Sequence, residues 1–124
     1  MSEKIKITAG QVQVEAELND SPTAKSVAEA LPIKAKGNRW GGEIYFPIPV
    51  EAELEADSRD VLEAGELGYW PTGSAFCIFF GPTPASQADE IRAASAVNII
   101  GKVKGDLSQL PNVDDGADIL LEAD

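Results

Sequence analysis

The chain has 124 residues, of which 44% are hydrophobic and 25% are charged, as in an ordinary globular domain. Its 21 acidic residues outnumber 10 basic ones, and the net charge of −11 disfavours binding to nucleic acid or to an anionic membrane surface. The sequence contains no histidine, which excludes Ser-His-Asp and Cys-His catalytic sites and imidazole metal ligands.

The first third of the chain predicts a β-hairpin followed by a helix. Apolar and polar residues alternate over 5–9 and over 12–18, on either side of a glycine. This period of two is typical of an antiparallel pair with one buried face. Ser21 is suited to a helix N-cap and the proline after it to the first helical position. We therefore expect a helix over 22–31, ended by the next proline.

The middle third predicts further strands. Residues 34–42 are rich in glycine and lysine and indicate a loop, and 43–46 indicate a strand. Apolar and acidic residues alternate over 50–57, which predicts a half-buried strand. Two more strands are predicted over 65–70 and 75–80, joined by a Pro-Thr-Gly turn.

The last third completes a mainly β pattern. Residues 81–84 contain two prolines and cannot form a strand, and a weak capping box predicts a short helix over 86–94. Strands are predicted over 97–103 and 118–122. Strands outnumber helices and lie close together in sequence, which favours an antiparallel sheet curled into a barrel. No linker or repeat interrupts the chain, so we predict a single domain over 1–124.

Aromatic residues are confined to the middle of the chain. All eight lie in two clusters, over 40–46 and 69–80. The phenylalanines are predicted to fill the barrel, whereas the tryptophans and tyrosines either plug its ends or form the walls of a binding pocket. Cys77, the single cysteine, lies within an apolar run and is predicted to be an inert core thiol.

Several segments, in this order, resemble the cyclophilins. Residues 21–31 resemble the first cyclophilin helix, 73–78 resemble Gly-Ser-Gln-Phe-Phe-Ile, and 97–103 resemble Val-Val-Phe-Gly-Lys-Val. Trp-Gly-Gly-Glu-Ile-Tyr-Phe at 40–46 and Gly-Tyr-Trp-Pro at 68–71 are similar to the small bacterial and archaeal cyclophilin-like proteins. The resemblance covers nearly the whole chain. It implies a closed, eight-stranded cyclophilin-like β-barrel with one or two short helices.

The resemblance also implies what an isomerase site would need. Cyclophilins lower the barrier to rotation about an X-Pro bond, about 18–20 kcal/mol, with an arginine that donates to the prolyl nitrogen. That role would fall to Arg39 here. The family's pocket glutamine and phenylalanine are replaced by Ala75 and Cys77, and the wall of its groove by the bulkier Tyr69 and Trp70.

Two functions follow as hypotheses. The favoured one is a binding domain without efficient isomerase activity, which holds a peptide or a small apolar ligand. Its predicted ligand-binding residues are Trp40, Tyr45, Tyr69, Trp70, Ala75 and Cys77. The alternative is a divergent peptidyl-prolyl isomerase with Arg39 as the catalytic residue. The sequence predicts no cofactor or metal and leaves the oligomeric state open, and the absence of a signal sequence predicts a cytoplasmic protein.

Overall fold

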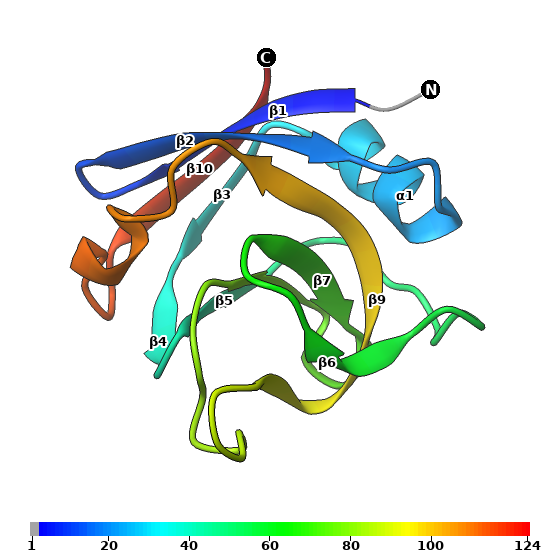
Figure 1. Ribbon diagram of the computed structural model, residues 1–124. Helices are drawn as coiled ribbons and strands as arrows, with labels where there is room; N and C mark the ends of the chain where they lie inside the picture. The colour runs from blue at the N-terminus through cyan, green and yellow to red at the C-terminus, as the bar shows by residue number, and fades with distance from the viewer. Residues whose placement is uncertain (1–2) are drawn as a thin grey trace.

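The computed structural model describes residues 3–124, which fold mainly into antiparallel β-strands (Figure 1). The strands of this region number ten and are, in order, β1 (Glu3–Ala9), β2 (Val12–Leu18), β3 (Ile33–Lys36), β4 (Asn38–Trp40), β5 (Glu43–Pro47), β6 (Arg59–Leu62), β7 (Glu66–Trp70), β8 (Ala75–Phe79), β9 (Ile91–Lys104) and β10 (Asp118–Ala123). The same residues contain one α-helix, α1 (Pro22–Ala30), and two 3-10 turns, Pro71–Gly73 and Leu110–Asn112. No helix in the described residues is long and apolar enough to span a bilayer.

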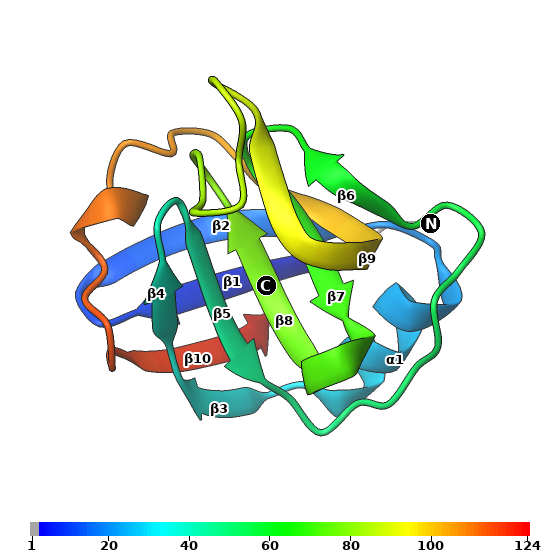
Figure 2. The same ribbon diagram turned by 90° about the horizontal axis from the view of Figure 1, so that it is seen from below.

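The strands form two layers joined by β9. Their order is β3-β10-β1-β2-β9-β7-β8-β5-β4, and β6 pairs separately with β9. Strands β1, β2, β3 and β10 lie in one layer, and β4, β5, β7 and β8 lie in the other (Figures 1 and 2). Strand β9 bends from one layer to the other: its first half pairs with β6, and its second half pairs with β2 and β7.

The sequence predicts a closed, eight-stranded barrel, and this closure is not confirmed. The described residues form ten strands, and the two end strands of the order, β3 and β4, are not paired with each other. They follow one another in the chain across Gly37, where β3 pairs with β10 and β4 pairs with β5. A Cβ on Gly37 would lie 3.0 Å from Cδ1 of Ile119, so glycine permits this bend close to β10. The loop predicted over 34–42 is therefore wrong, because its glycines mark only a bend and a turn.

Several predicted elements are confirmed. The alternating segments at the N-terminus form the β1–β2 hairpin, in which Ile7 pairs with Val14. The first helix begins as expected, because Ser21 Oγ accepts a hydrogen bond from the Ala24 N–H at 3.2 Å. The predicted strands around the Pro-Thr-Gly turn are β7 and β8, and the last predicted strand is β10.

The strand predicted over 50–57 is wrong, since this segment pairs with no strand in the described structure. Its backbone is held by a side chain instead. The Glu55 N–H donates to Asn98 Oδ1 at 2.7 Å, and Asn98 Nδ2 donates to the Glu53 carbonyl at 2.9 Å. Asn98 is fully buried, and its Nδ2 also donates to Thr23 Oγ1 in α1 at 3.0 Å. One buried asparagine thus replaces a neighbouring strand, a role that alternation in sequence does not reveal.

The helix predicted over 86–94 is also wrong, because β9 already occupies its last part. Ala88 has a φ of +53°, a left-handed conformation that a right-handed helix does not contain. Ser86 does not cap a helix: its Oγ accepts hydrogen bonds from the Thr83 N–H at 2.9 Å and the Arg92 N–H at 3.1 Å. The sequence pattern also gives no indication of β6, which pairs with this part of β9.

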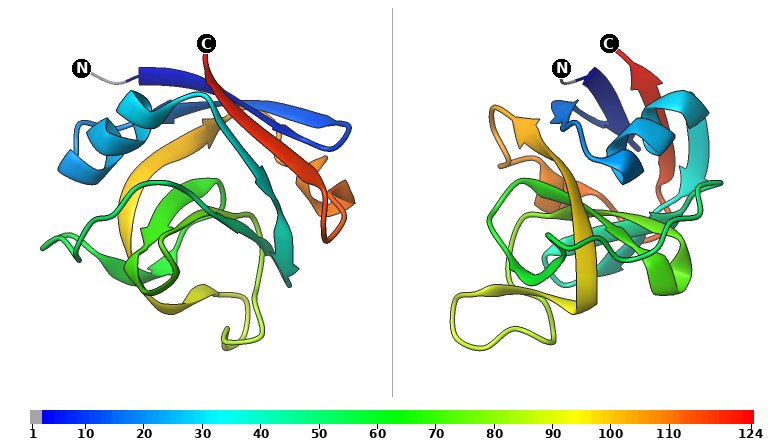
Figure 3. Two further views of the ribbon diagram at one scale, coloured as in Figure 1. Left: turned by 180° about the vertical axis from the view of Figure 1, so that it is seen from behind. Right: turned by 90° about the vertical axis from the view of Figure 1, so that its right-hand side faces the viewer.

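Successive side chains of β5, β7 and β8 point to opposite faces of the sheet, which divides their hydrophobic residues between two cores. The larger core lies between the layers and includes the inward-facing residues Ile44, Phe46, Leu67, Tyr69, Phe76 and Ile78. The smaller core lies on the opposite face of β8, against β6 and the first half of β9, and consists of Leu62, Ala75, Cys77, Phe79, Ile91, Ala93 and Val97. Figure 3 shows, in two further views, how β9 connects the layers and so borders both cores.

Candidate functional site

A pocket of about 290 Å³ lies beside the smaller core, on the outer face of the β5–β8–β7 layer. It is lined by Trp40 from β4, Glu43 and Tyr45 from β5, Trp70 from β7, and Ala93, Ala94 and Val97 from β9. Its walls are therefore three aromatic rings and three small or branched apolar side chains. A single carboxyl group provides the charged chemistry of the pocket.

A tight turn positions Trp40 and Glu43. These two residues pair across the β4–β5 hairpin, which reverses at Gly41 and Gly42. The Gly42 N–H donates to the carbonyl of Pro82 at 2.7 Å. A Cβ on Gly42 would lie 2.2 Å from the carbonyl carbon of the residue that precedes Pro82, so only glycine allows this close approach. The turn is thus clamped by backbone contacts, and the two side chains at its ends are fixed at the pocket.

The Trp70 ring is fixed from two sides. Its Nε1–H donates to the Ser95 hydroxyl on β9 at 2.6 Å. One face of the ring lies so close to Gly73 that a Cβ on this glycine would be 3.0 Å from the ring carbons. The neighbouring Gly68 has the same function for β9, because a Cβ there would lie 2.7 Å from Val97 Cγ2. Two glycines therefore allow the indole and the β9 wall to pack against the sheet.

Glu43 is a buried carboxyl, with only 6% of its surface exposed. In the described part of the chain it takes part in no ion pair. Burial raises its pKa to about 7, and a hydrogen bond with the Cys77 thiol opposes part of this rise. Burial also raises the pKa of Cys77 well above its usual value, so the thiol is neutral and unreactive. Glu43 can therefore be present in either protonation state near neutral pH.

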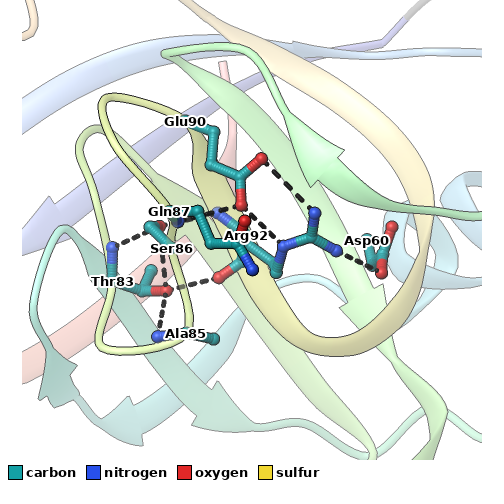
Figure 4. Close-up of polar contacts among 7 residues, drawn as sticks. All are labelled: Asp60, Thr83, Ala85, Ser86, Gln87, Glu90 and Arg92. Carbon is teal, nitrogen blue, oxygen red and sulfur yellow. Dashed lines mark hydrogen bonds and ion pairs between the residues drawn. The ribbon is translucent and has the colours of Figure 1, made fainter.

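A polar network holds the start of β9 against the loop before it (Figure 4). The Thr83 hydroxyl donates to the Arg92 carbonyl, and Ser86 Oγ accepts from the backbone N–H groups of both residues. The Arg92 guanidinium donates to Glu90 at 2.7 Å and to Asp60 of β6 at 2.9 Å. The residues that follow Arg92 form one wall of the pocket, so this network sets the position of that wall.

The structure brings together three of the predicted ligand-binding residues and separates a fourth from them. Trp40, Tyr45 and Trp70 line the pocket. Tyr69 is fully buried in the larger core, where its hydroxyl donates to the Val50 carbonyl at 2.6 Å. Because neighbouring residues of a strand point to opposite faces, Tyr69 and Trp70 lie on different sides of β7.

Ala75 and Cys77 lie beneath the pocket rather than in its lining. Both are buried in the smaller core, on the same face of β8. Cys77 contributes to the site through its hydrogen bond with Glu43.

Arg39 is directed away from the pocket. Its guanidinium donates to the carbonyls of Gly41 at 2.8 Å, Pro111 at 3.1 Å and Val113 at 2.7 Å. Its Cζ lies 5.1 Å from the centroid of the Phe80 ring. These contacts tie β4 to the 3-10 turn before β10, and they occupy most of the donors of the side chain.

Glu43 and the β9 wall were not among the predicted site residues. Glu43 and Tyr45 are two residues apart on one strand, and Trp40 lies opposite Glu43 across a two-glycine turn. This spacing could have placed the three side chains on one face. The sequence pattern concealed Ala93 and Ala94 because they fall within the predicted helix over 86–94, and it gave no reason to place Val97, at the start of the strand predicted over 97–103, beside the aromatic residues.

The described residues also bear on metal binding and contain a second cavity. No group of three or more Cys, Asp or Glu side chains in residues 3–124 is placed to hold a metal ion. A second, open cavity of about 740 Å³ lies between the β1–β2 turn and residues 109–117. Its lining, within the described residues, includes no aromatic side chain.

Comparisons with known proteins agree on the fold. A family model described as cyclophilin-like matches residues 3–122. The solution structure of the hypothetical protein AF2241 from Archaeoglobus fulgidus is similar, with 42% sequence identity and a TM-score of 0.85, over 99% of this chain and 95% of that chain. No match was found among curated proteins.

Proposed function

This chain belongs to the cyclophilin-like family, and we propose that it is a binding domain whose pocket on the outer face holds a small apolar ligand or one side chain of a peptide. The observation that supports this most directly is the convergence of Trp40, Tyr45 and Trp70 on one cavity. The positions of Trp40 and Trp70 are set by the turn and by the Ser95 hydrogen bond, so these two rings need little ordering on binding.

The dimensions of the pocket limit the ligand. A volume of about 290 Å³ is at the lower end of the range for small-molecule sites. One ring or one compact head group fills such a space, and an extended peptide would reach it with a single side chain. Aromatic walls with one polar group are typical of sites in which apolar contact supplies affinity and the polar group orients the ligand.

The competing hypothesis is a prolyl isomerase with Arg39 in the electrostatic role. The family membership favours it. Against it stand the three backbone carbonyls that accept from the Arg39 guanidinium and the position of this residue outside the pocket lining. Stabilisation of a twisted amide needs donors free to reach the prolyl nitrogen.

Intrinsic fluorescence tests the binding function directly, because both tryptophans of the chain line the pocket. We expect small apolar compounds and proline-containing dipeptides, titrated as a panel, to include ligands that change the emission saturably. Tyr45→Ala removes one wall but keeps both reporters, and it should weaken binding about fivefold to tenfold. The control is Leu54→Ala, which changes an exposed side chain. Equal affinities of wild type and Tyr45→Ala, or no response to the panel, would contradict the proposal.

A proline-isomerisation assay tests the competing hypothesis. We expect the wild-type protein and Arg39→Ala to leave the uncatalysed rate of a proline peptide unchanged. A rate enhancement that disappears in Arg39→Ala would favour the isomerase instead.

A further inference from the structure

The chemistry of the pocket selects for positive charge. The faces of tryptophan and tyrosine rings carry negative electrostatic potential and attract cations within about 6 Å. Two tryptophans, one tyrosine and Glu43 line the same cavity. The protein as a whole has a net charge of −11, which draws cations toward its surface.

Among residues 3–124, no lysine or arginine lies in the lining to compete for this place. On the neighbouring strands, Arg39 of β4 is engaged with backbone carbonyls, and Arg92 of β9 is paired with Glu90 and Asp60. The described residues therefore provide no ion pair to an ionised Glu43, and a ligand cation would compensate its charge.

The walls restrict which cation fits. Ala93, Ala94 and Val97 offer no hydrogen-bond acceptor from their side chains. The lining side chains that can accept are the Glu43 carboxylate and the Tyr45 hydroxyl, too few to satisfy three N–H donors spread around a primary ammonium. Leaving such donors unpaired in an apolar cavity is unfavourable. A methylated ammonium group carries its charge on an apolar surface and has few or no donors.

From this geometry we infer that the pocket binds a quaternary or highly methylated ammonium head group, held by Trp40, Tyr45 and Trp70 with Glu43 as its counter-charge. The inference rests on the binding function proposed above and names the class of ligand. The head group belongs to a free small molecule or to a trimethylated lysine of a peptide, since the chemistry is the same for both.

Binding of such a cation should depend on pH. The cation favours ionised Glu43, whose pKa near 7 in the free protein leaves roughly a tenth of the molecules ionised at pH 6 and nine-tenths at pH 8. If the ionised form binds, affinity rises about tenfold between these two values. Cys77 of β8 is in contact with Glu43, and burial keeps its thiol neutral over this range. Tyr45 of β5 lines the same cavity.

The test compares choline with 3,3-dimethyl-1-butanol, which has the same shape but carbon in place of the charged nitrogen. At pH 8, tryptophan fluorescence should show that choline binds at least tenfold more tightly than 3,3-dimethyl-1-butanol. Glu43→Gln should remove most of the preference for choline and most of its pH dependence. The affinity for the neutral alcohol should be the same in this variant as in the wild type. Glu51→Gln is the matched control, because it removes the same charge at an exposed position.

The outcomes distinguish failure of the head-group inference from failure of the proposed binding function. Equal binding of choline and the alcohol, or choline binding that Glu43→Gln leaves intact, overturns the head-group inference and leaves the binding function standing. No binding of either compound overturns the head-group inference, while the wider panel still decides the binding function. A trimethyl-lysine peptide that binds more tightly than choline identifies a peptide source, and weaker binding identifies a free small molecule; both agree with the head-group chemistry.

Discussion

Burial of the Glu43 carboxyl affects the stability of the folded protein as well as ligand binding. In the unfolded chain a glutamate titrates near its ordinary pKa of about 4.3, whereas in the folded chain the pKa is about 7. Between these values the folded state holds a proton that the unfolded state has released. The contribution of protonated Glu43 to stability is therefore complete below about pH 4.3 and is lost as the pH rises through 7.

This linkage gives a prediction for Glu43→Gln, whose side chain stays neutral at every pH. We expect the free energy of unfolding of this variant, relative to wild type, to increase by about 2 kcal/mol between pH 5.5 and pH 8. Urea denaturation at the two pH values measures it. A difference between variant and wild type that is the same at both pH values would show that Glu43 titrates normally.

The sequence located the aromatic residues of the site but not their division between faces. Trp40, Tyr45 and Trp70, which the sequence clusters group together, line one pocket because all three are on strands of one layer (Figure 2). Tyr69 could have been separated from Trp70 by the period of a strand alone. Glu43 was missed because a glutamate next to a turn resembles any exposed residue, and its burial depends on the loop and β9 packed beside it.

At the scale of elements, the loop before β9 and the first half of β9 form the part of the fold that sequence patterns described least well. Residues 86–94 match a capping box, but Ser86 Oγ instead accepts from the Thr83 and Arg92 N–H groups and the Thr83 hydroxyl donates to the Arg92 carbonyl, which holds the loop in another conformation. Segment 50–57 alternates like a strand, but it is anchored by Asn98. In both cases the backbone is held by hydrogen bonds to a side chain. For segment 50–57, that side chain is also distant in sequence.

Substitution of Thr83 tests whether this loop supports the pocket wall. Thr83→Val keeps the shape of the buried side chain but leaves the Arg92 carbonyl and the Ala85 N–H without the hydroxyl that they share. We expect a loss of about 1–3 kcal/mol in the free energy of unfolding. The control is Thr72→Val, at an exposed position, with a change within about 0.5 kcal/mol. Equal stabilities of the two variants in urea denaturation would show that the network is unimportant.

At the scale of the whole molecule, the resemblance to cyclophilins predicted the family and the mainly β architecture. It did not predict the way in which the sheet ends. A bend at Gly37 places one continuous segment between β10 and β5, so the described sheet has two unpaired ends where a closed barrel would have none. The second hydrophobic core was equally hidden, since β8 is apolar on both faces and gives no alternation to interpret.

The division into two cores also separates two candidate ligand sites. The aromatic pocket lies beside the smaller core, and the open, polar cavity lies near the β1–β2 turn and residues 109–117. We propose that the ligand binds in the first of these. The two regions share no lining residue, so a method that reports on every backbone amide distinguishes them.

Amide chemical-shift mapping during a choline titration is therefore the most direct test of where the ligand binds. We predict saturable shifts concentrated over 40–45, at Trp70 and over 93–97, with little change over 109–117. Shifts centred on 109–117, with the tryptophan indole signals unmoved, would contradict the assignment of the aromatic pocket as the binding site.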